Sequence, residues 1–386
     1  MKILEKGVKA TKVRAEIFVG GSLAKGTLAK SDEYDVDIFV RFDKNYKDLS
    51  LELEKILKTV KVKAMRWHGS RDYFRVPRGN LTFEVIPVKK IKRMNEMDNI
   101  TDLSYFHVNY IKKNLSSAKR KEVVLAKKFC KAIGVYGAES YIGGFSGYGI
   151  ECLIIYYGGF EKMIRALEKI KGQEIIDIKK LYKKKSDVLI ELNESKLQGP
   201  IILVDPTWKE RNVFAGLTWE SFEKFRLRAR EFLKNPSKEF FSVGEINVSE
   251  LEKLAKKRRG EFVHVVLKTN RQEGDIAGTK MKKFSRFLCG NLEKYFLIVE
   301  KEFVYSNGQE ADLYLVVKSR GKVLRRGPPL KMKKACYIFK KRNEKVVSQN
   351  GRLFAKIKVD FNAKEFLKRI NKKVMREMGI SGMKII

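Results

Sequence analysis

An α+β fold is predicted by three features of the sequence. Strand and helix patterns alternate through the first 90 residues, and a mostly helical stretch follows from Asp102 to about Lys234. After Asn235-Pro236, where a helix is expected to stop, a second set of strand and helix patterns begins. A chain of 386 residues is long enough for two to four domains of roughly 100–200 residues each. We therefore predict three domains, over residues 1–110, 111–236 and 237–386.

The elements of the first domain follow from their residue patterns. The apolar run Ala15–Val19 predicts a strand, and Gly20-Gly21-Ser22 after it predicts a turn into a helix. The period of two in Asp35–Val40 predicts a half-buried strand, with its two aspartates on one face and its valines and isoleucine on the other. Two further elements are predicted, a helix over Leu49–Val60 and a strand over Leu81–Val88 that ends near Pro87.

The last domain is predicted to be basic and α+β. The strand-like segments VHVVLK, YFLIVEKEFVY, DLYLVVK and RLFAKIKVDF alternate with basic helical segments such as KMKKACYIFKKR. A helix over Ser221–Leu233 is expected to precede the domain boundary. No internal repeat or low-complexity run occurs in the sequence.

Charge is the unusual quantity of the composition. The chain carries 83 Lys and Arg against 46 Asp and Glu, a formal net charge of +37 that is spread along its whole length. This excess predicts a polyanionic partner, and nucleic acid is favoured over a membrane because the lysines accompany strands and helices alike. No apolar run approaches the roughly 18 residues of a spanning helix, and the four widely spaced cysteines are typical of reduced core thiols. We therefore expect a cytoplasmic protein that has no membrane partner.

Three acidic residues are predicted to meet on the first sheet. Asp35 and Asp37 project from one strand, and Glu84 can reach them from a neighbouring strand. Such carboxylates can hold two Mg²⁺ ions about 3.5–4 Å apart, an arrangement that suits phosphoryl transfer. Ser22 at the start of the first helix and Lys25 on its first turn are expected to receive phosphate oxygens there. We thus predict Asp35, Asp37 and Glu84 as catalytic residues and metal ligands.

The alternative for each of these motifs is a structural role. A D-x-D pair on a strand is by itself most often a solvated face. Here Ser22, within a G-S-x-x-K-G-T turn, lies 13 residues before Asp35, and a third carboxylate follows inside LTFEVIPV. Clustered carboxylates repel one another and are costly to desolvate. The combination therefore favours a cation site.

On these motifs the sequence resembles the polymerase beta-like nucleotidyltransferase superfamily and, within it, the archaeal class I CCA-adding enzymes. Further blocks resemble that family in the same order and extend the resemblance over most of residues 15 to 345. They are Asp102-Leu-Ser-Tyr-Phe-His107, Lys131 to Glu139 (KAIGVYGAE), Gly144-Phe-Ser-Gly-Tyr148, Val204-Asp-Pro with Arg211-Asn-Val, and Gly327-Pro-Pro-Leu-Lys-Met332. The resemblance implies a polymerase beta-like catalytic head, a mainly helical central domain and a basic α+β RNA-binding domain.

The resemblance also implies roles for individual residues. His107 and Lys131 match triphosphate contacts, through a ring N–H and an ammonium, and Arg211 matches an arginine that helps to read the incoming base. A further phosphate contact is a tyrosine in the family, but the ungapped match places Ser140 there, with Tyr141 adjacent. The third carboxylate is Glu84, where the family usually has aspartate.

The activity that the resemblance implies is template-independent addition of CCA to the 3′ end of tRNA, using CTP and ATP as substrates and Mg²⁺ as cofactor. The basic last domain is then expected to bind tRNA by shape and phosphates. Two alternatives stay open: another RNA-tailing nucleotidyltransferase, CC-only or poly(A)-type, and a noncatalytic RNA-binding protein on the same scaffold. The sequence also leaves open whether the protein is a homodimer. Aromatic residues among the cations can stack on bases or serve as core residues: Tyr295, Phe296, Tyr305, Tyr314 and Tyr337.

Overall fold

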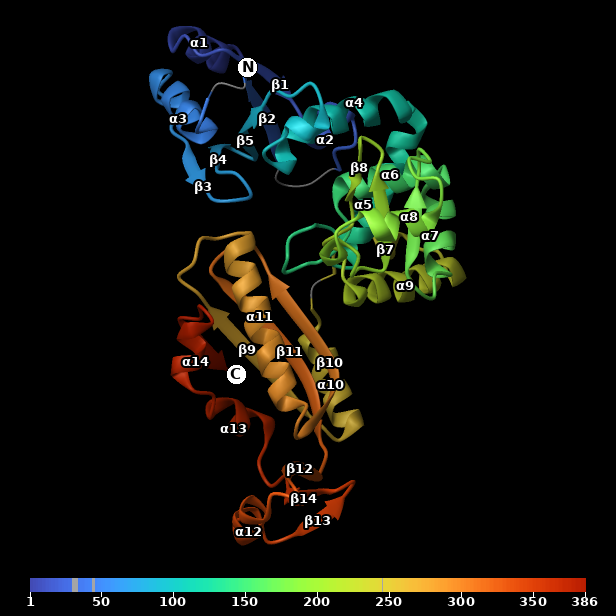
Figure 1. The fold of residues 1–386 in the computed structure, drawn as a ribbon, viewed down its shortest axis with the longest axis vertical. Helices are drawn as coiled ribbons and strands as arrows, with labels where there is room; N and C mark the ends of the chain where they lie inside the picture. Colours follow the sequence, from blue (N-terminus) through green and yellow to red (C-terminus); the bar gives the residue numbers. More distant parts are fainter. Residues whose placement is uncertain (30–33, 44–45, 245) are drawn as a thin grey trace. The chain divides into compact units, whose positions relative to one another are not determined.

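The computed structural model describes residues 1–29, 34–43, 46–244 and 246–386. The chain forms two compact units (Figure 1). The first comprises Met1–Ala138 and Ile142–Gly244, and the second comprises Glu139–Tyr141 and Glu245–Ile386. Part of the loop GTLAKSDEY, residues 30–33, lies outside the described residues. The α+β class is confirmed, while the three predicted domain boundaries stay predictions.

The first unit begins with a mixed five-stranded sheet in the order β1-β2-β5-β4-β3. Only β2 and β5 pair in parallel, and the other neighbours are antiparallel. Pro87 lies inside β5 as the register partner of Val40, and the strand ends two residues later at Lys89, so the predicted strand Leu81–Val88 is confirmed to within one residue. The strands are β1 (Ala15–Val19), β2 (Tyr34–Phe42), β3 (Met65–Trp67), β4 (Tyr73–Arg78) and β5 (Leu81–Lys89).

Two helices, α1 (Lys2–Ala10) and α3 (Leu49–Thr59), pack with this sheet in one hydrophobic core. Asp48 caps α3 by accepting hydrogen bonds from the backbone N–H groups of the first turn. The core contains the apolar side of β2, including Val36, Ile38 and Val40, together with Leu53 of α3. The period-two pattern of β2 is therefore confirmed, and the aspartates lie opposite this core.

The rest of the first unit is mainly helical around a second core. Phe129 is fully buried in it and contacts the rings of Phe160 and Phe225. A small three-stranded sheet, in the order β6-β7-β8, adds strand structure to the predicted helical region. The helices are α4 (Ser104–Asn114), α5 (Ser117–Ala132), α6 (Gly147–Tyr157), α7 (Phe160–Glu168), α8 (Lys185–Glu191) and α9 (Trp219–Lys234), and the strands are β6 (Glu174–Asp177), β7 (Ile201–Asp205) and β8 (Trp208–Asn212).

The second unit is a four-stranded sheet, β10-β11-β9-β15, that packs with α11 (Asp275–Leu292), and a separate three-stranded sheet, β12-β14-β13, with α12 (Lys333–Lys341) beside it. The predicted strand segments are all confirmed. Their bounds are β9 (Glu261–Lys268), β10 (Phe296–Tyr305), β11 (Glu310–Ser319), β12 (Lys322–Pro329), β13 (Val346–Gln349), β14 (Arg352–Lys358) and β15 (Gly382–Ile385), with the further helices α10 (Val248–Arg258), α13 (Ala363–Lys368) and α14 (Lys372–Glu377).

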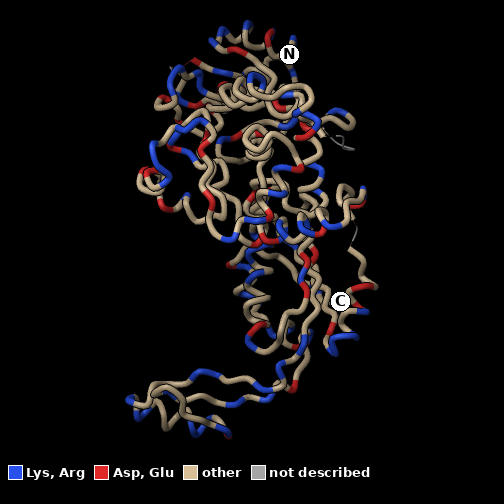
Figure 2. The backbone as a smooth tube through the Cα atoms, turned by 90° about the vertical axis from the view of Figure 1, so that its right-hand side faces the viewer, with Lys and Arg blue, Asp and Glu red and all other residues tan. Residues whose placement is uncertain are grey.

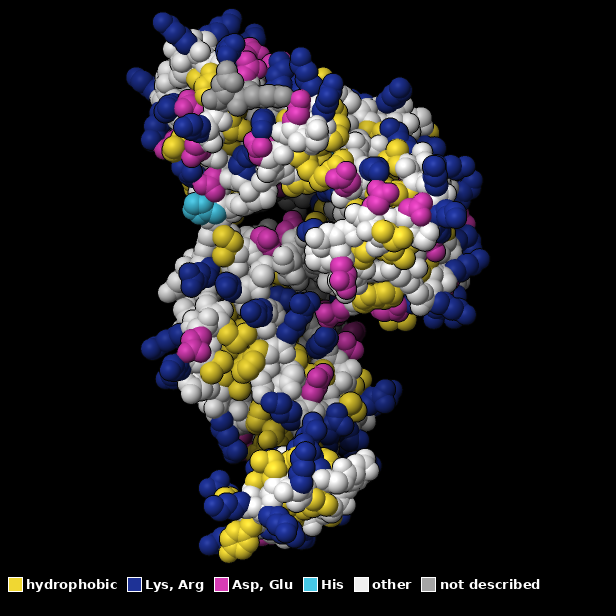
Figure 3. Space-filling model, viewed as in Figure 1, with side chains coloured by type: hydrophobic (Ala, Val, Ile, Leu, Met, Phe, Trp, Pro, Cys, Tyr) yellow, Lys and Arg dark blue, Asp and Glu magenta, His cyan; other side chains and the backbone are white. Residues whose placement is uncertain are grey.

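Lysine and arginine positions recur along the backbone of both units, including the small β12-β14-β13 sheet (Figure 2). Among the charged side chains on the visible face of the second unit, Lys and Arg are far more prominent than Asp and Glu (Figure 3). Of the aromatic residues considered for base stacking, Phe296 is fully buried, whereas Tyr337 on α12 is 70% exposed. All four cysteines are buried thiols, as expected. Within the described ranges no helix is long and apolar enough to span a bilayer.

Candidate active site

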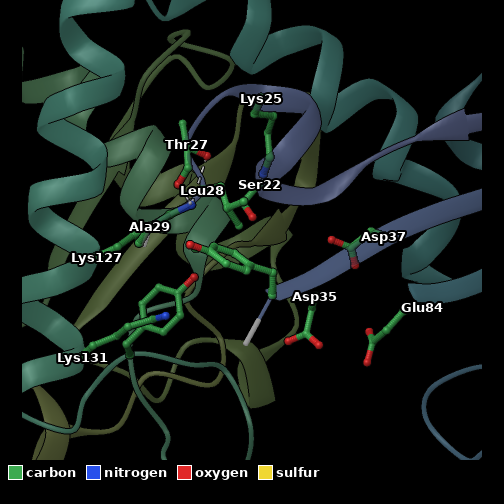
Figure 4. A pocket seen from close by; sticks show the side chains of 13 residues that line it. Ser22, Lys25, Thr27, Leu28, Ala29, Asp35, Asp37, Glu84, Lys127 and Lys131 are labelled. Carbon is green, nitrogen blue, oxygen red and sulfur yellow. Dashed lines mark hydrogen bonds between the residues drawn. The ribbon is translucent and has the colours of Figure 1, made fainter. Parts of the chain in front are cut away.

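A pocket of about 310 Å³ lies in the first unit where the sheet domain meets helix α5. The predicted residues Ser22, Lys25, Lys131 and the three acids all line it. Figure 4 shows the acids on one side of the pocket and Lys127 and Lys131 across from them. The full lining is Ser22, Lys25, Thr27, Leu28, Ala29, Tyr34, Asp35, Asp37, Glu84, Lys127, Lys131, Tyr136 and Gly147.

Strand pairing brings the three acids together. Asp37 on β2 is the register partner of Glu84 on β5, and Asp35 lies two residues earlier on the same face of β2. Their meeting, which the sequence predicted from two separate segments, therefore follows from the parallel β2–β5 pairing.

The glycine turn fits closely over Asp37. The backbone N–H of Gly20 donates to the carbonyl of Asp37 over 2.9 Å. Gly21 has φ +57°, and a Cβ at this position would lie 1.6 Å from Asp37 Oδ2. Only glycine allows this approach and this backbone conformation together. The turn sets the start of α2 (Gly21–Lys25), which carries Ser22 and Lys25 into the pocket.

The three acids lie close together, and an added cation would reduce the repulsion between their negative charges. Burial raises the pKa of the Asp37 carboxyl, and the nearby Asp35 raises it further, while Lys25 opposes the shift. Arg75 on β4 bridges the other two acids, with Nη2 3.7 Å from Asp35 Oδ1 and Nε 3.4 Å from Glu84 Oε1. In the described part of the chain, no three His, Cys, Asp or Glu side chains are already arranged to hold a metal ion. The carboxylate oxygens nevertheless have the chemistry that Mg²⁺ requires.

A buried ionic cluster forms the wall of the pocket behind Lys25. Glu151 of α6, with no exposed surface, accepts hydrogen bonds from Lys25 Nζ at 2.6 Å, Thr27 Oγ1 at 2.6 Å and Lys127 Nζ at 2.9 Å. Burial would raise the pKa of Glu151, but the charges of Lys25 and Lys127 hold it below its ordinary value. Burial lowers the pKa of Lys127, against the pull of Glu151. The cluster ties the sheet domain to helices α5 and α6.

A second buried acid, Asp205 at the end of β7, binds three side chains that are far apart in sequence. His107 Nε2 lies 2.9 Å from Oδ2, Arg211 Nη1 donates to Oδ2 over 2.7 Å, and the hydroxyl of Tyr148 donates to Oδ1 over 3.0 Å. The Tyr148 ring stacks on His107 with centroids 4.1 Å apart, and Lys25 Nζ lies 5.8 Å from the centroid of that ring. His107 and Arg211 therefore form one group around Asp205, which Tyr148 connects to Lys25.

Burial and the neighbouring charges together determine the protonation state of His107. Burial lowers the pKa of His107, although Asp205 raises it in part. Burial alone would raise the pKa of Asp205, but the hydrogen bond from His107 and the charges of His107 and Arg211 keep it well below its usual range. A neutral His107 facing an ionised carboxylate carries its proton on Nε2. The ring N–H that the sequence analysis assigned to phosphate is thus directed at Asp205.

Comparisons with known proteins agree with this geometry. Residues 1–99 match the family model for a nucleotidyltransferase domain, and residues 121–242 match that for the second domain of tRNA nucleotidyltransferases. A CCA-adding enzyme of Nanoarchaeum equitans is 33% identical over 92% of this chain and 86% of its own length. The chain belongs to the archaeal CCA-adding enzyme family.

Other relatives support the same assignment. A CCA-adding enzyme of Methanocaldococcus jannaschii is 30% identical over 88% of this chain and 77% of its own length, and one of Saccharolobus shibatae is 27% identical over 91% and 82%. Among solved structures, a cytoplasmic RNA terminal U-transferase superposes with a TM-score of 0.49 at 13% identity, covering 64% of this chain and 90% of the other. The sequence matches to the curated relatives and to the family models show that this CCA-adding enzyme family member is a tRNA nucleotidyltransferase.

Six of the nine candidate residues line the pocket, whereas His107 and Arg211 lie in the Asp205 group and Ser140 lies elsewhere. Ser140 does not line the pocket and groups with the second unit, where its backbone N–H donates to Asp275 over 3.1 Å. The neighbouring Tyr141 donates its hydroxyl to Asn307 over 3.0 Å and meets the Tyr305 ring edge-on. The structure thus places both Ser140 and Tyr141 in contacts of the second unit.

Several residues of the site were not predicted from the sequence, and those that hold its buried charges in place are Thr27, Lys127, Glu151 and Asp205. Glu151 carried a usable signal, because a single acid inside the apolar helical run GIECLII needs a buried cation. Asp205 lay inside a block that resembled the family, but its position gave no sign of its partners. Lys127 carried no signal in a chain this rich in lysine.

Proposed function

We propose that this tRNA nucleotidyltransferase adds C, C and A in turn to the 3′ end of tRNA, taking them from CTP and ATP without a nucleic-acid template. The observation that carries the proposal is one pocket whose two walls differ in charge. Ser22 and Lys25 at the start of α2 form a phosphate-binding wall, and Asp35, Asp37 and Glu84 form an acidic wall. This division suits a reaction in which a triphosphate and a hydroxyl must meet.

In this proposal the acidic wall holds divalent metal, which we take to be Mg²⁺. Asp35, Asp37 and Glu84 supply the hard oxygen ligands, and Glu84 does so with one more methylene than the usual aspartate. Bound there, two Mg²⁺ ions supply activation of the 3′ hydroxyl and neutralisation of the leaving group. Arg75 then has to give up its contacts with Asp35 and Glu84, which is feasible because both pairs are longer than 3.3 Å.

The opposite wall positions the triphosphate. The hydroxyl of Ser22, the Lys25 ammonium and Lys131 offer donors to the phosphate oxygens. The bond from the RNA 3′ oxygen to the α-phosphorus forms as the bond from that phosphorus to pyrophosphate breaks. Ser22 and Lys25 fix the phosphates in line for this attack, since positioning supplies much of the catalysis in phosphoryl transfer.

Base selection falls to the Asp205 group in this proposal. Arg211 presents a planar fork of donors that can address acceptors on both cytosine and adenine. Asp205 accepts a hydrogen bond from Arg211 Nη1 and so fixes the orientation of the guanidinium group. His107 is bound to the same carboxylate and stacks on Tyr148, whose ring lies near Lys25. In this proposal His107 acts on the triphosphate indirectly, by helping to position Tyr148 and Lys25.

The second unit is proposed to bind the body of the tRNA. Its exposed lysines and arginines suit contacts with phosphates, which recognise shape more than sequence. Such binding releases counterions, so the affinity for tRNA falls steeply as salt rises. Tyr337, exposed on the basic helix α12, is the aromatic side chain best placed to stack on a base.

A primer-extension assay tests the function. Purified protein, Mg²⁺ and tRNA ending at its discriminator base are incubated with CTP, with ATP or with both, and the products are resolved on a gel. We expect two additions with CTP alone and three, ending in CCA, with both nucleotides. Asp35→Ala/Asp37→Ala, the control, is expected to bind tRNA and extend nothing.

Other outcomes would contradict parts of the proposal. Two additions with both nucleotides, or an open-ended run of A, would agree with the proposed nucleotidyl-transfer chemistry. Either result would assign the protein to another RNA-tailing activity. Extension by the Asp35→Ala/Asp37→Ala protein would overturn the assignment of the acidic wall. Tight binding of tRNA with no extension by the wild-type protein would leave only an RNA-binding scaffold.

A further inference from the structure

We propose that Glu151 is a positioning residue that aims Lys25 at the triphosphate, with Lys127 and Thr27 as its fixed support. The inference rests on the proposed function, because it assumes that Lys25 contacts phosphate. It adds a residue that has no contact with the substrate in that proposal. It also assigns different roles to two buried lysines that line the same pocket.

The two lysines differ in how their N–H groups are used. Lys127 Nζ donates to Glu151 Oε1 over 2.9 Å, to the Thr27 carbonyl over 3.2 Å and to Thr27 Oγ1 over 3.1 Å. An ammonium has three donors, so those of Lys127 are fully used inside the protein. Lys127 therefore acts as structure, even though it lines the pocket.

Lys25 keeps donors for a ligand. Its one hydrogen-bond partner among the described residues is Glu151 Oε2, at 2.6 Å, and its ammonium also lies near the Tyr148 ring. Two of its three N–H groups are thus left for the pocket, which its side chain lines. Because Lys25 is only 8% exposed, the direction of these donors depends on the group that holds the ammonium.

Glu151 provides that hold. One carboxylate oxygen is fixed by Lys127 and Thr27, which leaves the other oxygen pointing to Lys25. The cluster of two lysines and one glutamate keeps one surplus positive charge beside the pocket. Glu151 also offsets the repulsion between the two buried ammonium groups. Without it, Lys25 would lose both its direction and its stabilising partner.

A double-mutant cycle on the full-length protein tests this inference. KM and kcat for CTP are measured by extension of tRNA that lacks its CCA end, for wild type, Lys25→Met, Glu151→Gln and the double variant. Lys25→Met is expected to raise KM about 10- to 100-fold, as for loss of a charged hydrogen bond. Glu151→Gln is expected to raise KM about 10-fold with kcat changed much less, and to add nothing in the Lys25→Met background.

Controls separate positioning from general damage. Glu161→Gln removes a carboxylate of α7 that is 67% exposed and paired with Arg165, and we expect it to leave KM unchanged. Thr27→Val removes the hydrogen bond to Glu151 and the one that Thr27 Oγ1 accepts from Lys127, while keeping every charge. It is expected to raise KM a few-fold even if Glu151→Gln folds poorly. Thermal unfolding of each variant shows which proteins are folded at the assay temperature.

Three results would overturn the inference, and they can be told apart. If Lys25→Met raises KM and Glu151→Gln raises it by a further, independent factor, Glu151 does not act through Lys25, while the proposed function stands. If Lys25→Met leaves KM unchanged, the phosphate role of Lys25 fails and the inference fails with it. An unchanged KM in both folded Glu151→Gln and folded Thr27→Val would also refute the positioning role.

Discussion

The acids of the first unit fall into two groups that differ in how their oxygens are satisfied. Glu151 and Asp205 have no exposed surface, and hydrogen bonds from side chains of distant segments reach both of their oxygens. Asp35 and Glu84 lie at the pocket and contact Arg75 through long ion pairs, and Asp37 beside them is held at a raised pKa. The carboxylates of the first group have lasting partners within the folded chain. The carboxylates of the second group can still bind cations that arrive with the substrate.

The difference shows why residue type alone does not identify a catalytic acid. A buried carboxylate that is fully paired lowers the energy of the fold, and removing it leaves unpaired cations. Carboxylates that crowd together without enough donors raise that energy, which is tolerated where function needs them. The two groups should therefore respond in opposite ways to the same kind of substitution.

The largest effect is expected for the pocket acids on activity. Asp37→Asn should lower the rate of CMP addition by at least about 10²–10³-fold, because it removes a charged ligand from the acidic wall. Its melting temperature should stay equal to that of wild type or rise, because a carboxylate with a raised pKa opposes folding at neutral pH. Single-turnover extension and calorimetry measure the two quantities. A clear fall in melting temperature would place Asp37 with the structural acids.

Asp205→Asn, unlike Asp37→Asn, should clearly lower the stability of the fold. Breaking a buried ion pair by removing one partner costs about 3–5 kcal/mol, so unfolding in denaturant should occur at a clearly lower concentration. Arg211 and His107 would lose their common acceptor, and the ratio of kcat/KM for CTP to that for UTP should fall. Tyr148→Phe, which removes one hydrogen bond and keeps the ring, is the matched control. Wild-type stability of Asp205→Asn would contradict the division into two groups.

The pH dependence of stability should separate the groups again. The folded-state pKa of Glu151 and Asp205 lies below the ordinary values of 4.5 and 3.8, so their stabilisation is present above these values and is lost as the pH falls. The pKa of His107 is lowered from 6.5, so stability also falls as the unfolded chain takes up that proton below about pH 6.5.

The contribution of Asp37 to the pH dependence of stability has the opposite sign. Its pKa is raised above 3.8, so its charge destabilises the fold at neutral pH and this penalty disappears in acid. Melting temperatures measured from pH 4 to 8 should show wild type losing stability in acid, and Asp37→Asn gaining on wild type only towards neutral pH. Parallel curves for the two proteins would refute the assigned shift.

The smallest effect is expected for Arg75. Its ion pairs with Asp35 and Glu84 are long and partly exposed, and such pairs contribute about 0.2–1 kcal/mol. Arg75→Gln should therefore tighten Mg²⁺ binding by up to about fivefold, measured by calorimetry without nucleotide. Arg78→Gln, at the end of the same strand, is the control and should leave Mg²⁺ binding unchanged. Weaker Mg²⁺ binding in Arg75→Gln would mean that Arg75 supports the acids in binding metal.

The strand of Asp35 and Asp37 and the glycine turn beside it could be predicted because their signals are local. The period of two in Asp35–Val40 places the aspartates on one face whatever the strand packs against, and Gly20-Gly21 marks a backbone that passes close to another group. The third acid was reachable from the sequence because parallel pairing of two recognisable strands puts Glu84 beside Asp37. The resemblance to the archaeal family supplied the rest of the prediction.

What only the tertiary structure decided is the pairing of charges over long distances in sequence. Lys25 and Glu151 are 126 residues apart, and His107 and Asp205 are 98 residues apart. No periodicity links such positions, since their contact depends on how α6 packs against the sheet domain and where β7 ends. The sequence alone therefore determined the presence of an acidic strand beside a glycine turn in a basic α+β protein. Packing determined which lysine keeps its donors for a ligand, because burial forces each desolvated charge to find its partner within the folded chain.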